Sequence, residues 1–282
     1  MICLATFLKR LPVIYCETPE GLPILMTSLT VLALASTMMT SHVQTIEPRM
    51  LRQPDIHGNT VVFVYAGDLW ASTTESGSIA RRIATNVGAR AGAANSPTAR
   101  PHISPDGKWV AFTGNYDGSA NIYVVSIDGG EPKRVTYSNS TDQAIGWTPD
   151  GKIAYATPEG NPYLGRQAKL MLINPKGGLP EDTPIKEIAA GSFFAGGDKI
   201  AYNRVNSFGF NWRRYRGGTQ GRISIYDLKT NKYEELPAKR EQSYFPMVVG
   251  DSIYYISDRT NGTLNLFRNA GGKDTQIGRA HV

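Results

Sequence analysis

Short apolar runs recur along the chain, each directly after a polar turn sequence. Residues 105–108 (PDGK) precede the run 109–112 (WVAF), and the same turn recurs at residues 149–152 before a second run. Looser copies of the turn and strand begin at His57, Gly196 and Gly250. Short apolar runs bounded by glycine-containing turns predict β-strands joined in hairpins.

A second apolar run follows each of these strands. The runs are centred on Leu69, Ile122, Leu170, Ile223 and Leu266, which are 53, 48, 53 and 43 residues apart. Each repeat has two further strands. An inner strand precedes the turn, for example at residues 102–104, 144–147 and 193–195, and a polar strand follows the second apolar run, which gives four strands per repeat. A period of about 40–50 residues with four strands is typical of a propeller blade. The sequence therefore predicts an all-β propeller with five four-stranded blades.

Two insertions interrupt this period, at residues 158–168 in the third repeat and 207–221 in the fourth. The second insertion carries Arg213, Arg214 and Arg216 among aromatic residues. Guanidinium groups bind carboxylates and phosphates, and together with aromatic rings they also stack on single-stranded bases. The structural alternative is that Arg216 braces the insertion by donating hydrogen bonds to carbonyl groups or nearby acids. The three arginines are candidate contacts to a peptide or protein partner, and the structural interpretation stays open.

The N-terminal region has the pattern of a secretory leader. Lys9 and Arg10 precede an apolar stretch at residues 22–35 that ends in Ala-Leu-Ala. This stretch is shorter than the roughly 20 apolar residues that a membrane span requires. We therefore predict that residues 1–35 are a signal peptide and that the protein is exported, to the periplasm in a bacterium. The alternatives are a retained anchor, a non-native leader, or a cytoplasmic protein whose translation starts later.

Composition narrows the class of protein. Of 282 residues, 41% are hydrophobic and 19% are charged, and 29 glycines and 17 prolines are spread along the chain. This excludes a disordered chain and a coiled coil. The net charge is +6, but 24 acidic residues alternate with 30 basic ones, so nucleic acid is not an expected partner. The cysteines, Cys3 and Cys16, both lie in the leader, which leaves no cysteine for a disulfide or zinc site in the propeller.

Catalytic and metal-binding motifs are absent from the sequence. It contains no Gly-x-Ser-x-Gly elbow, no His-Glu-x-x-His and no phosphate-binding loop. We assign structural roles to His57, in a turn, and His102, on an inner strand. Residues 115–118 (NYDG) resemble the start of a calcium loop but lie where a hairpin turn is expected. We predict no catalytic residue, no metal site and no cofactor in this chain.

Three motifs together resemble one family. They are residues 54–58 (PDIHG), residues 67–70 (GDLW) and residues 215–219 (YRGGT). Over residues 51–277 the sequence is similar to the N-terminal six-bladed propeller of tricorn protease and its bacterial homologues. The PDGK turn is less specific, because propellers of the TolB and prolyl-oligopeptidase types share it.

This resemblance implies a function for a longer protein. Tricorn-like enzymes are serine peptidases that degrade short peptides, and their first propeller precedes a second propeller, a PDZ-like domain and the catalytic domains. The chain would then be a channel and scaffold module without catalytic residues, with peptides and those further domains as partners and a homo-oligomeric parent. Five of the six implied blades are present, and residues 278–282 do not continue the pattern. We therefore expect a truncated, open arc.

Two alternatives assign the propeller to other functions. One is a TolB-like propeller that binds proteins at the cell envelope, and the other is the gating propeller of a prolyl-oligopeptidase-type hydrolase. Whether the parent protein is an enzyme depends on sequence beyond this chain, because no residue here matches a catalytic motif of any of the three.

Overall fold

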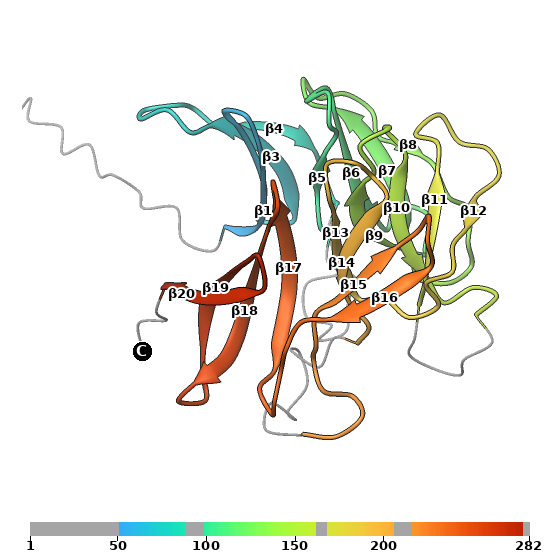
Figure 1. Cartoon of the computed structure of the whole chain (residues 1–282). Helices are drawn as coiled ribbons and strands as arrows, with labels where there is room; N and C mark the ends of the chain where they lie inside the picture. Colours follow the sequence, from blue (N-terminus) through green and yellow to red (C-terminus); the bar gives the residue numbers. More distant parts are fainter. Residues whose placement is uncertain (1–50, 88–98, 162–167, 206–215, 279–282) are drawn as a thin grey trace, which may run out of the picture. The chain divides into compact units, whose positions relative to one another are not determined.

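Five separate four-stranded antiparallel sheets make up the propeller, one for each sequence repeat (Figure 1). The computed structural model describes residues 51–87, 99–161, 168–205 and 216–278. The predicted leader, residues 1–35, lies outside these ranges. Within them, no helix is long and apolar enough to cross a membrane. The prediction of an all-β propeller with five four-stranded blades is confirmed.

Each blade uses its four strands in chain order, from the innermost to the outermost. Blade 1 contains β1 (Arg52–His57), β2 (Thr60–Tyr65), β3 (Asp68–Thr73) and β4 (Arg81–Ala84). Blade 2 contains β5 (His102–Ile103), β6 (Trp109–Gly114), β7 (Asn121–Ser126) and β8 (Lys133–Arg134). Blade 3 contains β9 (Gln143–Trp147), β10 (Ile153–Thr157), β11 (Lys169–Ile173) and β12 (Glu181–Asp182). Blade 4 contains β13 (Ala190–Phe193), β14 (Lys199–Asn203), β15 (Ser224–Asp227) and β16 (Lys232–Glu235). Blade 5 contains β17 (Ser243–Val249), β18 (Ser252–Thr260), β19 (Thr263–Ala270) and β20 (Lys273–Gly278).

Burial explains why the second strands read as continuous apolar runs. All five residues of β10 are buried, as are the last five of β6, because these strands pack against a blade on each side. The outermost strand β16 (KYEE) is exposed along its whole length. Within a blade, the buried second strand is therefore apolar and the exposed outermost strand is polar.

The repeated PDGK turn has a specific backbone geometry. Gly107 and Gly151 adopt φ values of +73° and +86°, a region that glycine enters without steric cost. Asp106 fixes the first turn, because its Oδ1 accepts hydrogen bonds from the Ser104 hydroxyl at 2.5 Å and the Lys108 backbone N–H at 3.1 Å. The turn sequence therefore sets the hairpin between the first and second strands, as predicted.

Apolar clusters fill the space between consecutive blades. Val62 and Leu69 of blade 1 pack with Phe112 and Tyr123 of blade 2, and all four side chains are at most 3% exposed. Three similar clusters join blades 2 to 3, 3 to 4 and 4 to 5. The inner strands β1, β5, β9, β13 and β17 lie side by side in that order. Burial of this apolar surface is the main contribution that holds the blades together.

Polar side chains also link blades, because they accept hydrogen bonds from backbone N–H groups in the inner strand of the next blade. These acceptor–donor pairs are Asp55–Ile103 at 2.7 Å, Thr113–Ala144 at 2.9 Å, Asn203–Phe245 at 2.8 Å and Ser192–Val248 at 3.0 Å. Asp55 belongs to the PDIHG motif, and His57 of the same motif packs over Gly107. This motif therefore connects blade 1 to blade 2.

Two predicted strands were misplaced. The inner strand predicted at residues 193–195 is β13, which ends at Phe193, because hydrogen bonds from Phe194 N to Lys199 O and from Gly197 N to Phe194 O close the turn. The strand predicted at residues 222–224 begins only at Ser224. The long connection between β4 and β5, which contains residues 88–98 outside the described ranges, was not recognised as a third insertion.

In blades 2 to 5, one side of the sheet packs against the preceding blade. In blade 1 the corresponding side is exposed. Ile56 is 60% exposed, whereas Ile103, at the matching position of blade 2, is 7% exposed. Phe63 is partly exposed, whereas its counterpart Phe112 is fully buried. The sixth blade that the family resemblance implies is not among the described residues.

Candidate functional site

The candidate residues lie at one end of the blades. In an antiparallel blade the first strand begins at the same end at which the second strand finishes. Arg100 and Ala189 therefore lie at the same end as Val205, which precedes the second predicted insertion, and Arg216, which lies within it. We call this end the insertion face.

Arg216 binds an acidic residue of the neighbouring blade. Its Nη2 lies 2.7 Å from Oδ2 of Asp258, at the end of β18, and the other carboxylate oxygen accepts the Gln242 backbone N–H at 2.7 Å. The Asp258 side chain is 8% exposed and that of Arg216 is 30% exposed. This is the bracing contact that the structural interpretation predicts. Arg213 and Arg214 lie outside the described residues, and a role of the three arginines in binding a peptide or partner stays a prediction.

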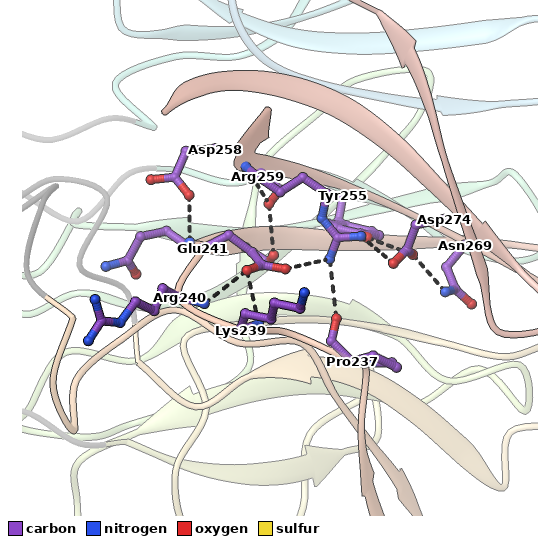
Figure 2. A network of polar contacts seen from close by, with 12 residues as sticks. Pro237, Lys239, Arg240, Glu241, Tyr255, Asp258, Arg259, Asn269 and Asp274 are labelled. Carbon is purple, nitrogen blue, oxygen red and sulfur yellow. Dashed lines mark hydrogen bonds and ion pairs between the residues drawn. The ribbon is translucent and has the colours of Figure 1, made fainter. Parts of the chain in front are cut away.

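A second arginine, next to Asp258 in sequence, organises a larger polar network (Figure 2). Arg259 forms ion pairs with Asp274 and, at 3.3 Å, with Glu241. Its guanidinium also lies over the rings of Tyr255 and Phe267, at 5.5 and 5.3 Å from the ring centres. The three charged side chains are only 16–19% exposed. The network thus ties β18 and β20 of blade 5 to the segment that precedes β17.

Hydrogen bonding sets the ionisation of both acids. Burial alone would raise the pKa of Asp274, but hydrogen bonds from Asn269, Arg259 and Tyr255 hold it below its usual value. Burial likewise acts to raise the pKa of Glu241, and backbone N–H groups, including those of Lys239 and Arg240, lower it overall. Both carboxylates are therefore stabilised in the charged form.

A separate polar cluster lies among the inner strands. The Arg100 guanidinium donates from Nη1 to the Ala189 carbonyl oxygen at 2.7 Å, and the Trp147 indole donates to the His102 carbonyl oxygen at 2.8 Å. Burial lowers the pKa of Arg100 to about 10. Burial also lowers the pKa of His102, opposed by the nearby charge of Asp55 and reinforced by that of Arg100. No local motif marks Arg100, because its partner Ala189 lies 89 residues away in the sequence.

A cavity of about 240 Å³ opens at the insertion face beside the YRGGT motif. Its lining residues are Arg204, Val205, Gly217, Gly218, Gln220, Arg222 and Glu235. Both of its arginines already have acidic partners, Arg204 with Glu187 at 2.6 Å and Arg222 with Glu235 at 3.3 Å. Its charges are therefore balanced by the chain itself.

The described residues do not assemble a hydrolytic or metal centre. Neither His57 nor His102 forms a side-chain hydrogen bond with a serine in the part of the chain that the structure describes. No group of three histidine, cysteine, aspartate or glutamate side chains in these ranges is placed to hold a metal ion. Residues 115–118 connect β6 and β7, where Asp117 binds Arg134 at 3.1 Å and accepts the Tyr123 hydroxyl at 3.0 Å.

Comparison with known proteins identifies relatives for most of the chain. Residues 48–280 match the family described as the tricorn protease N-terminal beta propeller domain. The chain is 32% identical to tricorn protease homolog 1 of Streptomyces coelicolor over 82% of its own length and 21% of that protein. It thus spans about a fifth of the length of such relatives.

Solved structures share the fold. A crystal structure of the tricorn protease superposes with a TM-score of 0.64 at 24% identity and covers 81% of this chain and 22% of that one. TolB from Acinetobacter baumannii superposes with a TM-score of 0.57 at 19% identity and covers 81% of this chain and 55% of that one. At these identities the structural matches establish the propeller fold alone.

Proposed function

Because this chain belongs to the tricorn protease family, as its N-terminal propeller domain, we propose that it is one module of a serine peptidase that degrades short peptides. The observation that carries this proposal is the family match over residues 48–280, which includes the PDIHG and YRGGT motifs. In this proposal the catalytic serine and histidine belong to domains outside the chain.

The module itself would guide peptides and hold the assembly together. The inner strands lie side by side, and Asp55 and Ser192 accept backbone hydrogen bonds from the inner strand of the next blade. These contacts between inner strands support the proposal that the blades form a fixed wall, along which peptides pass to or from the catalytic domains.

Two further properties accompany this proposal. The positively charged and apolar leader pattern in residues 1–35 supports export of the parent protein. The chain spans about a fifth of its relatives, which supports further domains of a longer protein as partners of this module, and we propose a homo-oligomeric parent as the family resemblance implies.

The natural reading frame tests the proposal. We expect the source DNA to continue beyond codon 282 into a second propeller, a PDZ-like segment and a domain with a catalytic serine. An α/β-hydrolase elbow downstream would instead assign the propeller to a prolyl-oligopeptidase-type enzyme. A stop codon after one more blade would contradict a peptidase and favour a binding propeller of the TolB type.

A further inference from the structure

Asp142 carries a carboxylate that is buried between two blades. It lies directly before β9 of blade 3, is 1% exposed, and its backbone N–H donates to the Ala120 carbonyl oxygen of blade 2 at 2.9 Å. Its side-chain Oδ1 accepts no hydrogen bond from the described residues, and no lysine or arginine among them forms an ion pair with it. A buried carboxylate oxygen without a partner is costly, so this position lacks a group that would neutralise it.

Hydroxyl groups surround this carboxylate, but they supply few protons to it. Thr136, Ser138 and Thr157 lie within hydrogen-bond reach of the carboxylate. The Thr136 hydroxyl gives its single proton to Asn121 Oδ1 at 3.2 Å, and the Ser138 hydroxyl lies 2.7 Å from the hydroxyl of Ser140. The Asn121 side chain is fixed in this orientation, because its Oδ1 also accepts the Ser138 backbone N–H at 2.8 Å. The shell around the carboxylate therefore presents more oxygen lone pairs than protons.

A second carboxylate adds to the negative charge. Burial is the largest cause that raises the pKa of Asp142, and the charge of Glu159, two residues after β10, raises it further. Glu159 is exposed and forms no ion pair among the described residues. The Lys169 ammonium, on the neighbouring strand β11, lies 3.9 Å from Asp182 instead. The two carboxylates and the hydroxyl oxygens thus meet without a cationic side chain from the described residues.

The ligand atoms select the kind of cation. All of them are oxygens, which calcium and magnesium prefer, whereas zinc takes nitrogen and sulfur ligands. Calcium accepts about six to eight oxygens in irregular geometry, whereas magnesium demands a nearly ideal octahedron. Thr141, directly before Asp142, and Glu159 are both exposed, so water can reach this position and complete the ligand set. Two carboxylates also match the double charge of a calcium ion.

We propose that Asp142 and Glu159, with the hydroxyl groups around them, bind a calcium ion between blades 2 and 3 at the insertion face. The site goes beyond the proposed function and does not rest on it. It also revises the prediction of no metal site, because its ligands come from two separate segments, residues 136–142 and 157–159, rather than from one calcium loop. The bound ion would hold blade 2 to blade 3 and so stabilise the propeller.

Calcium is titrated into the 282-residue chain after removal of metals with a chelator. We expect calorimetry to give a Kd below about 1 mM, and magnesium to bind at least tenfold more weakly. Calcium at about a hundredfold excess over this Kd should raise the thermal midpoint by roughly 5–10 °C. E159Q should weaken calcium binding at least tenfold, and D128N, at an aspartate whose side chain is 87% exposed, should bind as the unaltered chain does.

D142N gives the sharpest comparison, because it keeps the size of the side chain and removes its charge. Without metal, D142N should melt higher than the unaltered chain, since a buried charge is removed. With calcium the order should reverse, because only the unaltered chain gains stability from the ion.

Four results would overturn the proposal. They are the absence of calcium binding, an equal rise of the midpoint in sodium chloride of the same ionic strength, unchanged calcium binding by D142N, and magnesium binding as tight as that of calcium. If D142N does not fold, E159Q at its exposed position decides, and unchanged binding by E159Q would then overturn the site. None of these measurements involves a peptide, so a negative result leaves the proposed peptidase function to its own test.

Discussion

Replacing Arg259 with alanine should destabilise blade 5 more than any exposed arginine substitution. The change removes one cation from two carboxylates, Asp274 and Glu241, whose side chains are 19% and 16% exposed. Breaking a fully buried ion pair by removing one partner costs about 3–5 kcal/mol. Here both acids keep some exposure and retain other donors, from Asn269 and Tyr255 to Asp274 and from backbone N–H groups to Glu241. We therefore expect a loss of about 2–3 kcal/mol.

Thermal unfolding followed by circular dichroism measures this loss. For a domain of this size, 1 kcal/mol corresponds to roughly 2–4 °C in the midpoint, so R259A should melt roughly 4–12 °C lower. R81A is the matched control, because the Arg81–Asp128 pair is 3.2 Å long and its side chains are 48% and 87% exposed. An exposed pair of this kind contributes about 0–1 kcal/mol.

The effect of R259A should depend on pH. The pKa values of Asp274 and Glu241 are lowered in the folded protein. Their contribution to the free energy of unfolding is therefore complete above the unfolded-state pKa values of about 4, and it is lost as the pH falls through the folded-state values. The difference between the unaltered chain and R259A should therefore be largest at neutral pH and shrink on acidification. A loss no greater than that of R81A, or one that stays constant from neutral to acidic pH, would refute the reasoning.

Three further predictions concern other parts of the propeller. G221A should cost about 1–3 kcal/mol in a denaturant titration, because a Cβ there would overlap the Tyr244 ring, whereas G218A, with open space around it, should be neutral. In metal-free buffer, D142N should raise the melting midpoint at neutral pH, because it replaces a buried charged side chain with a neutral one. Burial raises the pKa of this 1%-exposed aspartate, so the stability that it contributes in its protonated form is lost as the pH rises, and the gain should vanish in acid. The chain should self-associate through the open side of blade 1, as measured by analytical ultracentrifugation. Because Ile56 is 60% exposed on that side, I56E should shift the chain toward the monomer. A monomeric unaltered chain would contradict this prediction.

The blades were predictable because their signals are local. A glycine with positive φ, such as Gly107 or Gly151, marks the hairpin between the first and second strands of each blade. The apolar run after it marks a strand buried on both sides. The start of β15 was not predictable in the same way. Ile223 is buried by contacts with blade 5, so it reads as a strand residue although the ladder begins one residue later.

The site was less predictable because its contacts join distant segments. The basic cluster in the insertion marks Arg216 in the sequence. No motif marks its partner Asp258, which reaches it because blade 5 packs beside blade 4. Arg259 finds its acids at positions 241 and 274. Arg100 reaches Ala189 because the inner strands curve, a property of the whole ring of blades. In each case the sequence supplies the charge, and the packing of blades supplies the partner.

Hydrolysis of a fluorogenic short peptide tests the central claim most directly. The natural full-length protein and the 282-residue chain are assayed side by side, with and without a serine-reactive inhibitor. We expect inhibitor-sensitive turnover by the full-length protein and none above buffer by the chain. Turnover by the chain alone, or persistent absence of turnover by the full-length protein across a peptide library, would contradict it.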